Sequence, residues 1–136
     1  MKTAIIYVKG YRRLERIVNT LSQTLQRGGH SVDLFAVGTS GEQPVSFRRY
    51  DRVYVGSPVL GYFRGRIPAE LAAYLQKAMG LDRPKTAVFV SKRLLGNSKT
   101  TKTIMAMLEH HGSQVVDFEF VGSLADAERF GQRLRE

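Results

Sequence analysis

The chain has 136 residues, of which 43% are hydrophobic and 24% charged, so it is long enough to bury a core as a single domain over residues 1–136. Lysine and arginine number 21 against 12 acidic residues, and this formal net charge of +9 favours anionic partners. The chain has no cysteine, which excludes thiolate chemistry. It also has no apolar run of the roughly 18 residues that a membrane span needs, so we expect a cytoplasmic protein without a membrane partner.

Along the chain, apolar runs typical of strands alternate with stretches whose apolar residues recur at helical spacing. Strands are predicted at Thr3–Val8, Ser31–Val37, Arg52–Ser57, Thr86–Ser91 and Gln114–Val121. Helical faces are predicted from Leu14, Ile17, Val18, Leu21 and Leu25, from Leu71, Tyr74, Leu75 and Met79, and from Ile104, Leu108 and His111. A last helix is expected around Leu124–Leu134, where Ser123 and Asp126 have the spacing of a capping box. Whether residues 38–51 contain a helix stays open.

Strands that alternate with crossover helices predict a doubly wound, five-stranded parallel sheet with helices on both faces. The first, third and fourth predicted strands are almost continuously apolar, as strands buried on both faces are, whereas the second and fifth alternate polar with apolar residues. We therefore expect the second and fifth strands at the two edges, which gives the strand order 2-1-3-4-5.

Three loops, KGYRRL, SPVLGYFRGRIP and SKRLLGNSKT, should meet at the carboxyl edge of this sheet, where open α/β sheets bind ligands. They contain no Asp or Glu, and their basic residues are Lys9, Arg12, Arg13, Arg64, Arg66, Lys92, Arg93 and Lys99. A mouth of one charge sign concentrates anions, and amides at the start of the first helix would add to anion binding. The alternative is a solvated basic surface.

The second and third loops carry further candidates. Gly61 permits a tight turn after Pro58, and Tyr62 and Phe63 offer flat surfaces on which a planar ligand could stack, or they cover the second helix. Asn97 or Ser98 is expected to cap the third helix.

The stretches MKTAIIYVKGYRRLERIVNTLSQTLQRGGHSVDLF and YDRVYVGSPVLGYFRGRIPAELAAYL resemble the flavodoxin-like flavoproteins, the second through its Gly-Ser-Pro turn and helix-starting proline. The resemblance implies FMN, with its phosphate at Lys9–Leu14, one ring face at Pro58–Tyr62 and the other side at Ser91–Asn97. The candidate cofactor residues are Lys9, Gly10, Tyr11, Arg12, Arg13, Leu14, Ser57, Pro58, Val59, Leu60, Gly61, Tyr62, Ser91, Lys92, Arg93 and Asn97.

The first loop departs from the family pattern Thr-x-Thr-Gly-x-Thr, because Arg12 stands at the glycine and Leu14 at the last hydroxyl. Arginine can hold phosphate through its own fork, so one hypothesis is a protein that binds FMN or a related anionic nucleotide and has a redox or electron-transfer role. The basic rim argues against a low-potential carrier. The alternative is a flavin-free module of the same fold that binds another anion or an acidic protein partner in a regulatory role.

Other functions find little support. There is no G-x-G-x-x-G dinucleotide motif, and three histidines at predicted helix ends form no metal set. Nucleic acid is an unlikely partner, because the basic residues gather at a concave rim. No nucleophile–base pair stands out, so no catalytic residue is assigned and enzymatic activity is left undecided.

Overall fold

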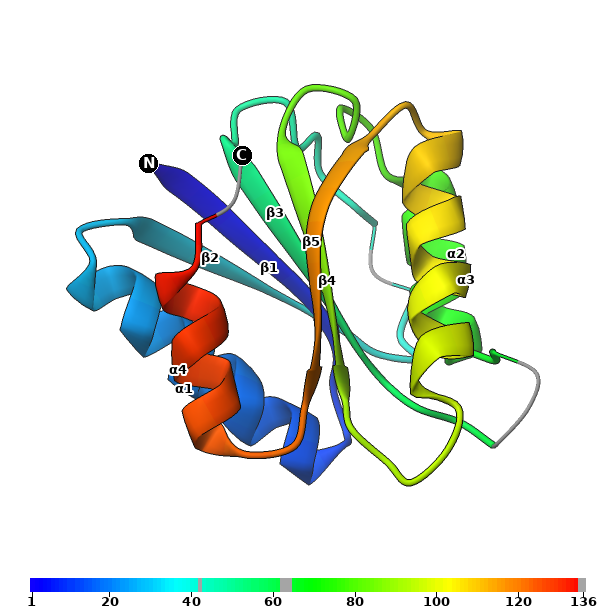
Figure 1. Ribbon diagram of the computed structural model, residues 1–136. Coiled ribbons are helices and arrows are strands. Elements are labelled where there is room, and N and C mark those ends of the chain that lie inside the picture. Colours follow the sequence, from blue (N-terminus) through cyan, green and yellow to red (C-terminus); the bar gives the residue numbers. More distant parts are fainter. Residues whose placement is uncertain (42, 62–64, 135–136) are drawn as a thin grey trace.

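The computed structural model describes residues 1–41, 43–61 and 65–134, and in them strands and helices alternate (Figure 1). The strands are β1 (Lys2–Val8), β2 (Ser31–Val37), β3 (Arg52–Pro58), β4 (Lys85–Ser91) and β5 (Gln114–Val121). The helices are α1 (Arg12–Arg27), α2 (Ala69–Lys77), α3 (Asn97–His110) and α4 (Leu124–Gln132). The strands pair in parallel in the order β2-β1-β3-β4-β5, which confirms the predicted order and both edge strands.

Two apolar clusters hold the helices against the two faces of the sheet. Alternate residues of each central strand point to opposite faces: Tyr54 of β3 packs with α1 and α4, whereas its neighbours Val53 and Val55 pack with α2 and α3. Figure 1 shows the same division, with α1 and α4 together on one side and α2 and α3 on the other. Both faces are therefore covered, which is why the central strands are almost continuously apolar.

The connection between β2 and β3 contains no helix in its described residues, 38–41 and 43–51. Phe47 and Tyr50 are fully buried there, and both rings pack against Phe35 of β2. The Phe47 amide donates to the Met79 carbonyl at 2.8 Å, which ties the connection to the segment after α2. Two aromatic side chains thus cover part of the sheet that a crossover helix would otherwise cover.

The prediction that Met79 shares a buried helical face with Leu71, Tyr74 and Leu75 is wrong. Helix α2 ends at Lys77, because Ala78 adopts an extended conformation, and the Met79 side chain is 63% exposed. The other three residues are buried, as expected. The bridge between Ser46 and Met79 gives this segment a strand-like partner in place of another helical turn.

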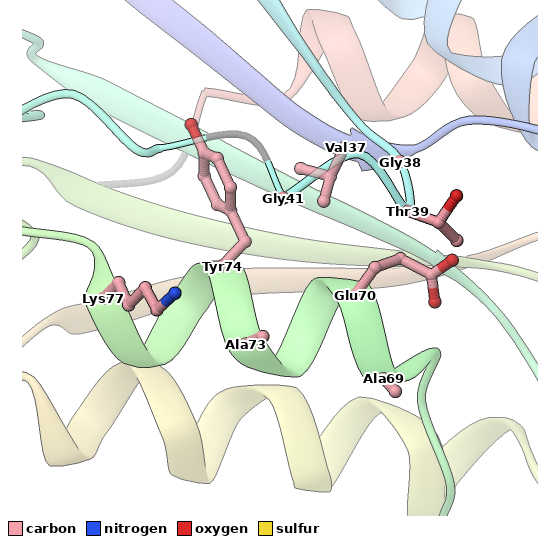
Figure 2. A pocket seen from close by; sticks show the side chains of 9 residues that line it. All are labelled: Val37, Gly38, Thr39, Gly41, Ala69, Glu70, Ala73, Tyr74 and Lys77. Carbon is pink, nitrogen blue, oxygen red and sulfur yellow. The ribbon is translucent and has the colours of Figure 1, made fainter.

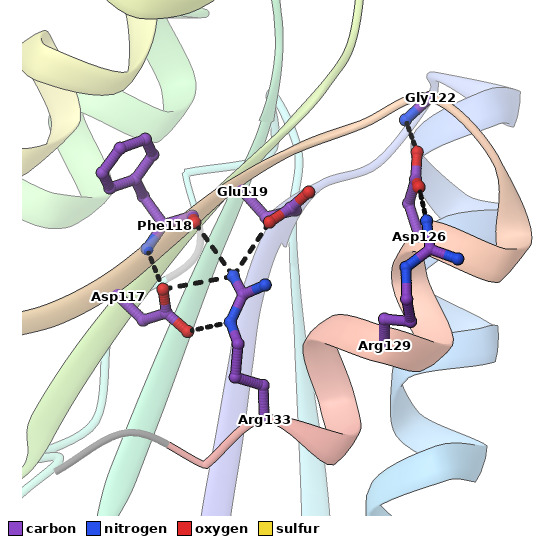
Figure 3. Close-up of polar contacts among 7 residues, drawn as sticks. All are labelled: Asp117, Phe118, Glu119, Gly122, Asp126, Arg129 and Arg133. Atoms are coloured by element: carbon purple, nitrogen blue, oxygen red, sulfur yellow. Dashed lines mark hydrogen bonds and ion pairs between the residues drawn. The ribbon is translucent and has the colours of Figure 1, made fainter.

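Helix α4 is fastened to the sheet at both ends (Figure 3). At its start, the Ser123 hydroxyl accepts from the Asp126 amide at 3.1 Å, as the capping-box spacing predicted. The Asp126 carboxylate accepts from the Gly122 amide, and this hydrogen bond is the main reason why the pKa of Asp126 lies below its ordinary value. Beyond the last turn, Arg133 donates to Asp117 at 2.9 Å and to Glu119 at 2.8 Å on β5.

Every helix in the described part of the chain follows a parallel strand, so each one begins at the carboxyl edge of the sheet and ends at the amino edge (Figure 1). The partial positive charges of the helix N-termini therefore gather on the edge where the basic loops lie. Within the described residues, no helix is long and apolar enough to cross a membrane.

Candidate functional site

The described surface has several cavities of similar size, about 340–430 Å³. One of them, of about 380 Å³, opens where the loops after β1, β3 and β4 meet. We call it the carboxyl-edge crevice. The described residues that line it are Tyr11, Arg12, Arg13, Leu14, Pro58, Val59, Leu60, Ser91 and Arg93. Each of these nine residues is one that the sequence proposed for cofactor binding. The structure thus brings the three loops together, while the binding role of the residues stays a prediction.

Helix α1 begins directly after the first loop, and no side chain caps its N-terminus. Gly10 adopts a φ of +98°, which suits glycine, and Tyr11 is the extended N-cap of α1 but makes no capping hydrogen bond with its side chain. The Tyr11 ring is half-buried and touches both apolar clusters, so it lies between the two layers at the end of the sheet. The first backbone amides of α1 are consequently left to solvent or to a ligand at this edge.

Glu15 supplies an acidic group that the three loops themselves lack. Its carboxylate, one turn into α1, accepts a hydrogen bond from the Gly10 amide at 2.7 Å. Burial raises the pKa of Tyr7, and the nearby Glu15 carboxylate raises it further. A negative charge therefore lies beside the first loop, the segment to which the resemblance assigns the phosphate. The sequence pattern did not indicate this contact, because a Glu in the first turn of a helix is common.

Arg12 and Arg13, which looked equivalent in the sequence, have different environments. The Arg13 guanidinium donates to the Lys92 carbonyl at 2.7 Å and to the Gly122 carbonyl at 3.4 Å. It thereby joins the start of α1 to the loops after β4 and β5. Arg12 is exposed and lines the crevice, and its side chain has no hydrogen bond or ion pair with another described residue.

The loop after β3 forms an apolar wall of the crevice. Pro58 and Val59 are buried, and Leu60 is half-buried beside them. Ser57 is fully buried and donates to the Pro58 carbonyl at 2.8 Å, so its hydroxyl serves the turn and lies outside the crevice lining. Gly61 is exposed with a φ of +72°, as expected for a tight turn, and does not line the crevice. Tyr62, Phe63 and Arg64 lie outside the described residues.

The loop after β4 is held by Asn97 in a way that the sequence did not predict. Gly96, with a φ of +91°, is the N-cap of α3, so the expectation of an Asn97 or Ser98 cap is wrong. Instead, the Asn97 side chain accepts from the Arg93 amide at 2.9 Å and donates to the Arg93 carbonyl at 2.7 Å. The Arg93 guanidinium then donates to the Val59 carbonyl at 3.2 Å, which couples this loop to the apolar wall.

The remaining basic candidates among the described residues do not line the carboxyl-edge crevice. Lys9 is exposed, and its side chain lies against Gly38 at the end of β2, where a Cβ atom would clash with it. Lys92 is exposed and packs along Gly122, so it also lies outside the crevice lining. Arg66 and Lys99 are exposed on the same side of the molecule, on the loop after β3 and the first turn of α3.

A second cleft, of about 340 Å³, lies between residues 37–41 and helix α2 (Figure 2). Tyr74 and Ala73 form its apolar side, and Glu70 and Lys77 stand at its two ends. It adjoins the connection between β2 and β3, whose described residues contain no helix. Periodicity in the sequence gave no sign of it, since it exists only because two distant segments approach without filling the space between them.

The crevice fits the two ends of FMN unequally. Pro58, Val59 and Leu60 form an apolar surface suited to one face of a flat ring system. At the phosphate end the Gly10 amide is already bonded to Glu15 and Arg13 is bonded to two carbonyls, which leaves the Arg12 side chain and the first amides of α1. No group of His, Asp and Glu among the described residues could hold a metal ion.

No protein-family model matches this sequence, and no curated protein matches it. The three-dimensional structure is nevertheless similar to solved flavodoxins. Flavodoxin 2 from Bacillus cereus matches with a TM-score of 0.76 at 20% identity, over 97% of this chain and 96% of the other. Flavodoxin 1 from Bacillus cereus matches with a TM-score of 0.76 at 14% identity, over 97% and 95%. A flavodoxin from Streptococcus pneumoniae gives 0.73 at 17% identity, over 97% and 94%.

These identities are too low to carry residue roles across, so the likeness concerns the arrangement of strands and helices. It agrees with the strand order and with the resemblance seen in the sequence around the first and third strands. The chain is therefore a protein of flavodoxin-like fold.

Proposed function

We propose that the carboxyl-edge crevice binds FMN, or a related anionic nucleotide, and that the protein has a redox or electron-transfer role. The observation that carries this proposal is one cavity lined by the loops after β1, β3 and β4 together, with the exposed guanidinium of Arg12 at its rim. Its position at the carboxyl edge is where sheets of this kind bind ligands. The similarity to solved flavodoxins in fold supports the choice of a flavin.

On this proposal the flavin ring lies against the wall formed by Pro58, Val59 and Leu60. The hydrogen bond from Arg93 to the Val59 carbonyl connects this wall to the loop after β4. When bound, the flavin would supply one- and two-electron transfer, and the protein would supply orientation and electrostatics. A basic rim stabilises the anionic reduced ring, so the reduction potential should lie above that of a flavin in an acidic site.

The phosphate would be held by a side chain more than by the backbone. Arg12 can form a bidentate pair with phosphate, and the first amides of α1 have no side-chain cap to compete with it. Arg13 contributes by fixing the loops, through its bonds to Lys92 and Gly122. This division replaces the hydroxyl-rich loop of the flavoproteins that the sequence resembles.

The test is the absorbance spectrum of the purified protein before and after addition of FMN, together with quenching of FMN fluorescence. We expect quenching that saturates, and a weaker affinity in Arg12→Gln. Arg27→Gln is the matched control, because Arg27 is an exposed arginine at the opposite end of the same helix. A colourless protein that leaves FMN fluorescence unchanged would remove the flavin proposal.

The second candidate is a flavin-free module in the cytoplasm that binds another anion or an acidic protein in a regulatory role. The Glu15 carboxylate on the Gly10 amide favours it, because this contact takes up a donor that a phosphate would use. Affinity for an inorganic anion such as pyrophosphate should then fall with salt, and the double variant Arg12→Glu, Arg13→Glu should lose it. Unchanged affinity in that variant would discard the crevice as the binding site.

A further inference from the structure

The loop between β4 and α3 carries two leucines into solvent. Leu94 is 91% exposed and Leu95 is 46% exposed, in a loop that is fixed by the Asn97–Arg93 hydrogen bonds. Figure 1 shows this loop projecting beyond the strand ends at the carboxyl edge. Exposure of a single leucine is common, but two adjacent leucines at the tip of a fixed loop suggest that the tip meets an apolar environment.

The same edge is positively charged. Lys92 and Arg93 directly precede the leucines, and Arg12 and Lys99 are exposed on the two neighbouring helix starts. The N-termini of all helices in the described chain lie here too, and each contributes partial positive charge. Two acidic groups near the edge are engaged with the backbone, since Glu15 accepts from Gly10 and Asp126 accepts from Gly122. Glu70, in the first turn of α2, is a further acidic residue at this edge, where the basic residues outnumber the acidic ones.

We propose that this edge docks on the surface of an anionic membrane, with Leu94 and Leu95 entering the interface and the surrounding lysines and arginines lying among the headgroups. Apolar residues beside Lys and Arg are the combination that binds such an interface, where basic residues add affinity for anionic lipids. This contact of a surface loop needs no spanning segment, so the absence of a long apolar run, from which we expected no membrane partner, does not bear on it.

The shape of the loop favours a membrane over an acidic protein. The leucines stand on a projection, and neither of them lines the carboxyl-edge crevice, the cleft beside α2 or the cavities next to Arg16 and Arg27. A projecting tip can enter a lipid surface directly, whereas a protein partner would need a matching pocket. Docking in this orientation also brings the carboxyl-edge crevice to the membrane surface, although the proposal does not depend on what the crevice binds.

The chain has no tryptophan, so a single introduced tryptophan reports on its own site. Leu94→Trp should show a blue-shifted, enhanced emission with vesicles of phosphatidylcholine and phosphatidylglycerol, and little change with phosphatidylcholine alone. Met79→Trp is the control, since Met79 is 63% exposed after the end of α2, at the amino edge. Its emission should not shift with either vesicle.

Vesicle sedimentation with the tryptophan-free chain separates insertion from simple charge attraction. Leu94→Ser with Leu95→Ser should weaken binding to the anionic vesicles at least about tenfold, as expected when leucine burial is lost, whereas Met79→Ser should not. Lys92→Glu should weaken it more than Lys77→Glu, a charge reversal at the amino edge. No binding to anionic vesicles at low salt, or binding that the double serine variant leaves unchanged, would overturn the proposal; the first result would favour an acidic protein at this edge.

Discussion

Arg12 and Arg13 are adjacent in the sequence, but the structure predicts that their replacement by glutamine will have separable effects. The Arg13 guanidinium donates to the Lys92 carbonyl at 2.7 Å and, over a longer 3.4 Å, to the Gly122 carbonyl. A hydrogen bond from a charged group contributes roughly 1.5–3 kcal/mol net, and exposure reduces this because water can replace the donor. We therefore expect Arg13→Gln to lower the free energy of unfolding by about 1 kcal/mol.

The Arg12 side chain makes no hydrogen bond or ion pair with the rest of the described chain, so Arg12→Gln should change the free energy of unfolding by less than about 0.5 kcal/mol. If Arg12 holds the phosphate of FMN, losing one charged hydrogen bond should raise the dissociation constant about tenfold. Riboflavin, which lacks the phosphate, should bind the wild type and Arg12→Gln with equal affinity.

Urea denaturation measures the first effect, and titration of flavin fluorescence measures the second. For a domain of this length, 1 kcal/mol corresponds to a fall in melting temperature of about 3 °C. The reasoning is refuted if Arg12→Gln destabilises the fold as much as Arg13→Gln, because the bonds of Arg13 to two distant loops would then not distinguish the two arginines.

Three further predictions follow from charges near the crevice and on α4. Glu15→Gln keeps an oxygen that can accept a hydrogen bond but removes the negative charge, so FMN should bind about fivefold more tightly in a fluorescence titration and riboflavin should not. Arg133→Gln should lower the free energy of unfolding by about 2 kcal/mol in urea denaturation, because it removes the charged partner of the Asp117 carboxylate, whose side chain is only 8% exposed (Figure 3). Arg129→Gln removes an ion pair made by an exposed arginine and should lower it by less than about 0.5 kcal/mol. The lowered pKa of Asp126 means that its carboxylate stabilises the fold at neutral pH, and that this contribution is lost as pH falls through the folded-state pKa. The free energies of unfolding of the wild type and Asp126→Asn should therefore converge in acid. A difference that stays constant with pH would contradict this.

Local sequence patterns determined the elements of this protein. Continuous apolar runs identified the central strands, and alternating runs identified β2 and β5 as the edges, because burial on two faces or one face leaves a direct mark on composition. With the order 2-1-3-4-5, the loops after β1, β3 and β4 had to converge at one edge. The lining of the crevice by residues of all three loops follows from this topology.

Only the tertiary structure decided what individual side chains do at that edge. Arg13 finds its acceptors 79 and 109 residues away in the sequence, and Asn97 bonds to Arg93 in preference to capping its own helix. Met79 became exposed because a bridge to Ser46 replaced another turn of α2. Such outcomes depend on which groups from distant segments come within hydrogen-bond distance, and neither residue type nor spacing along the chain records that.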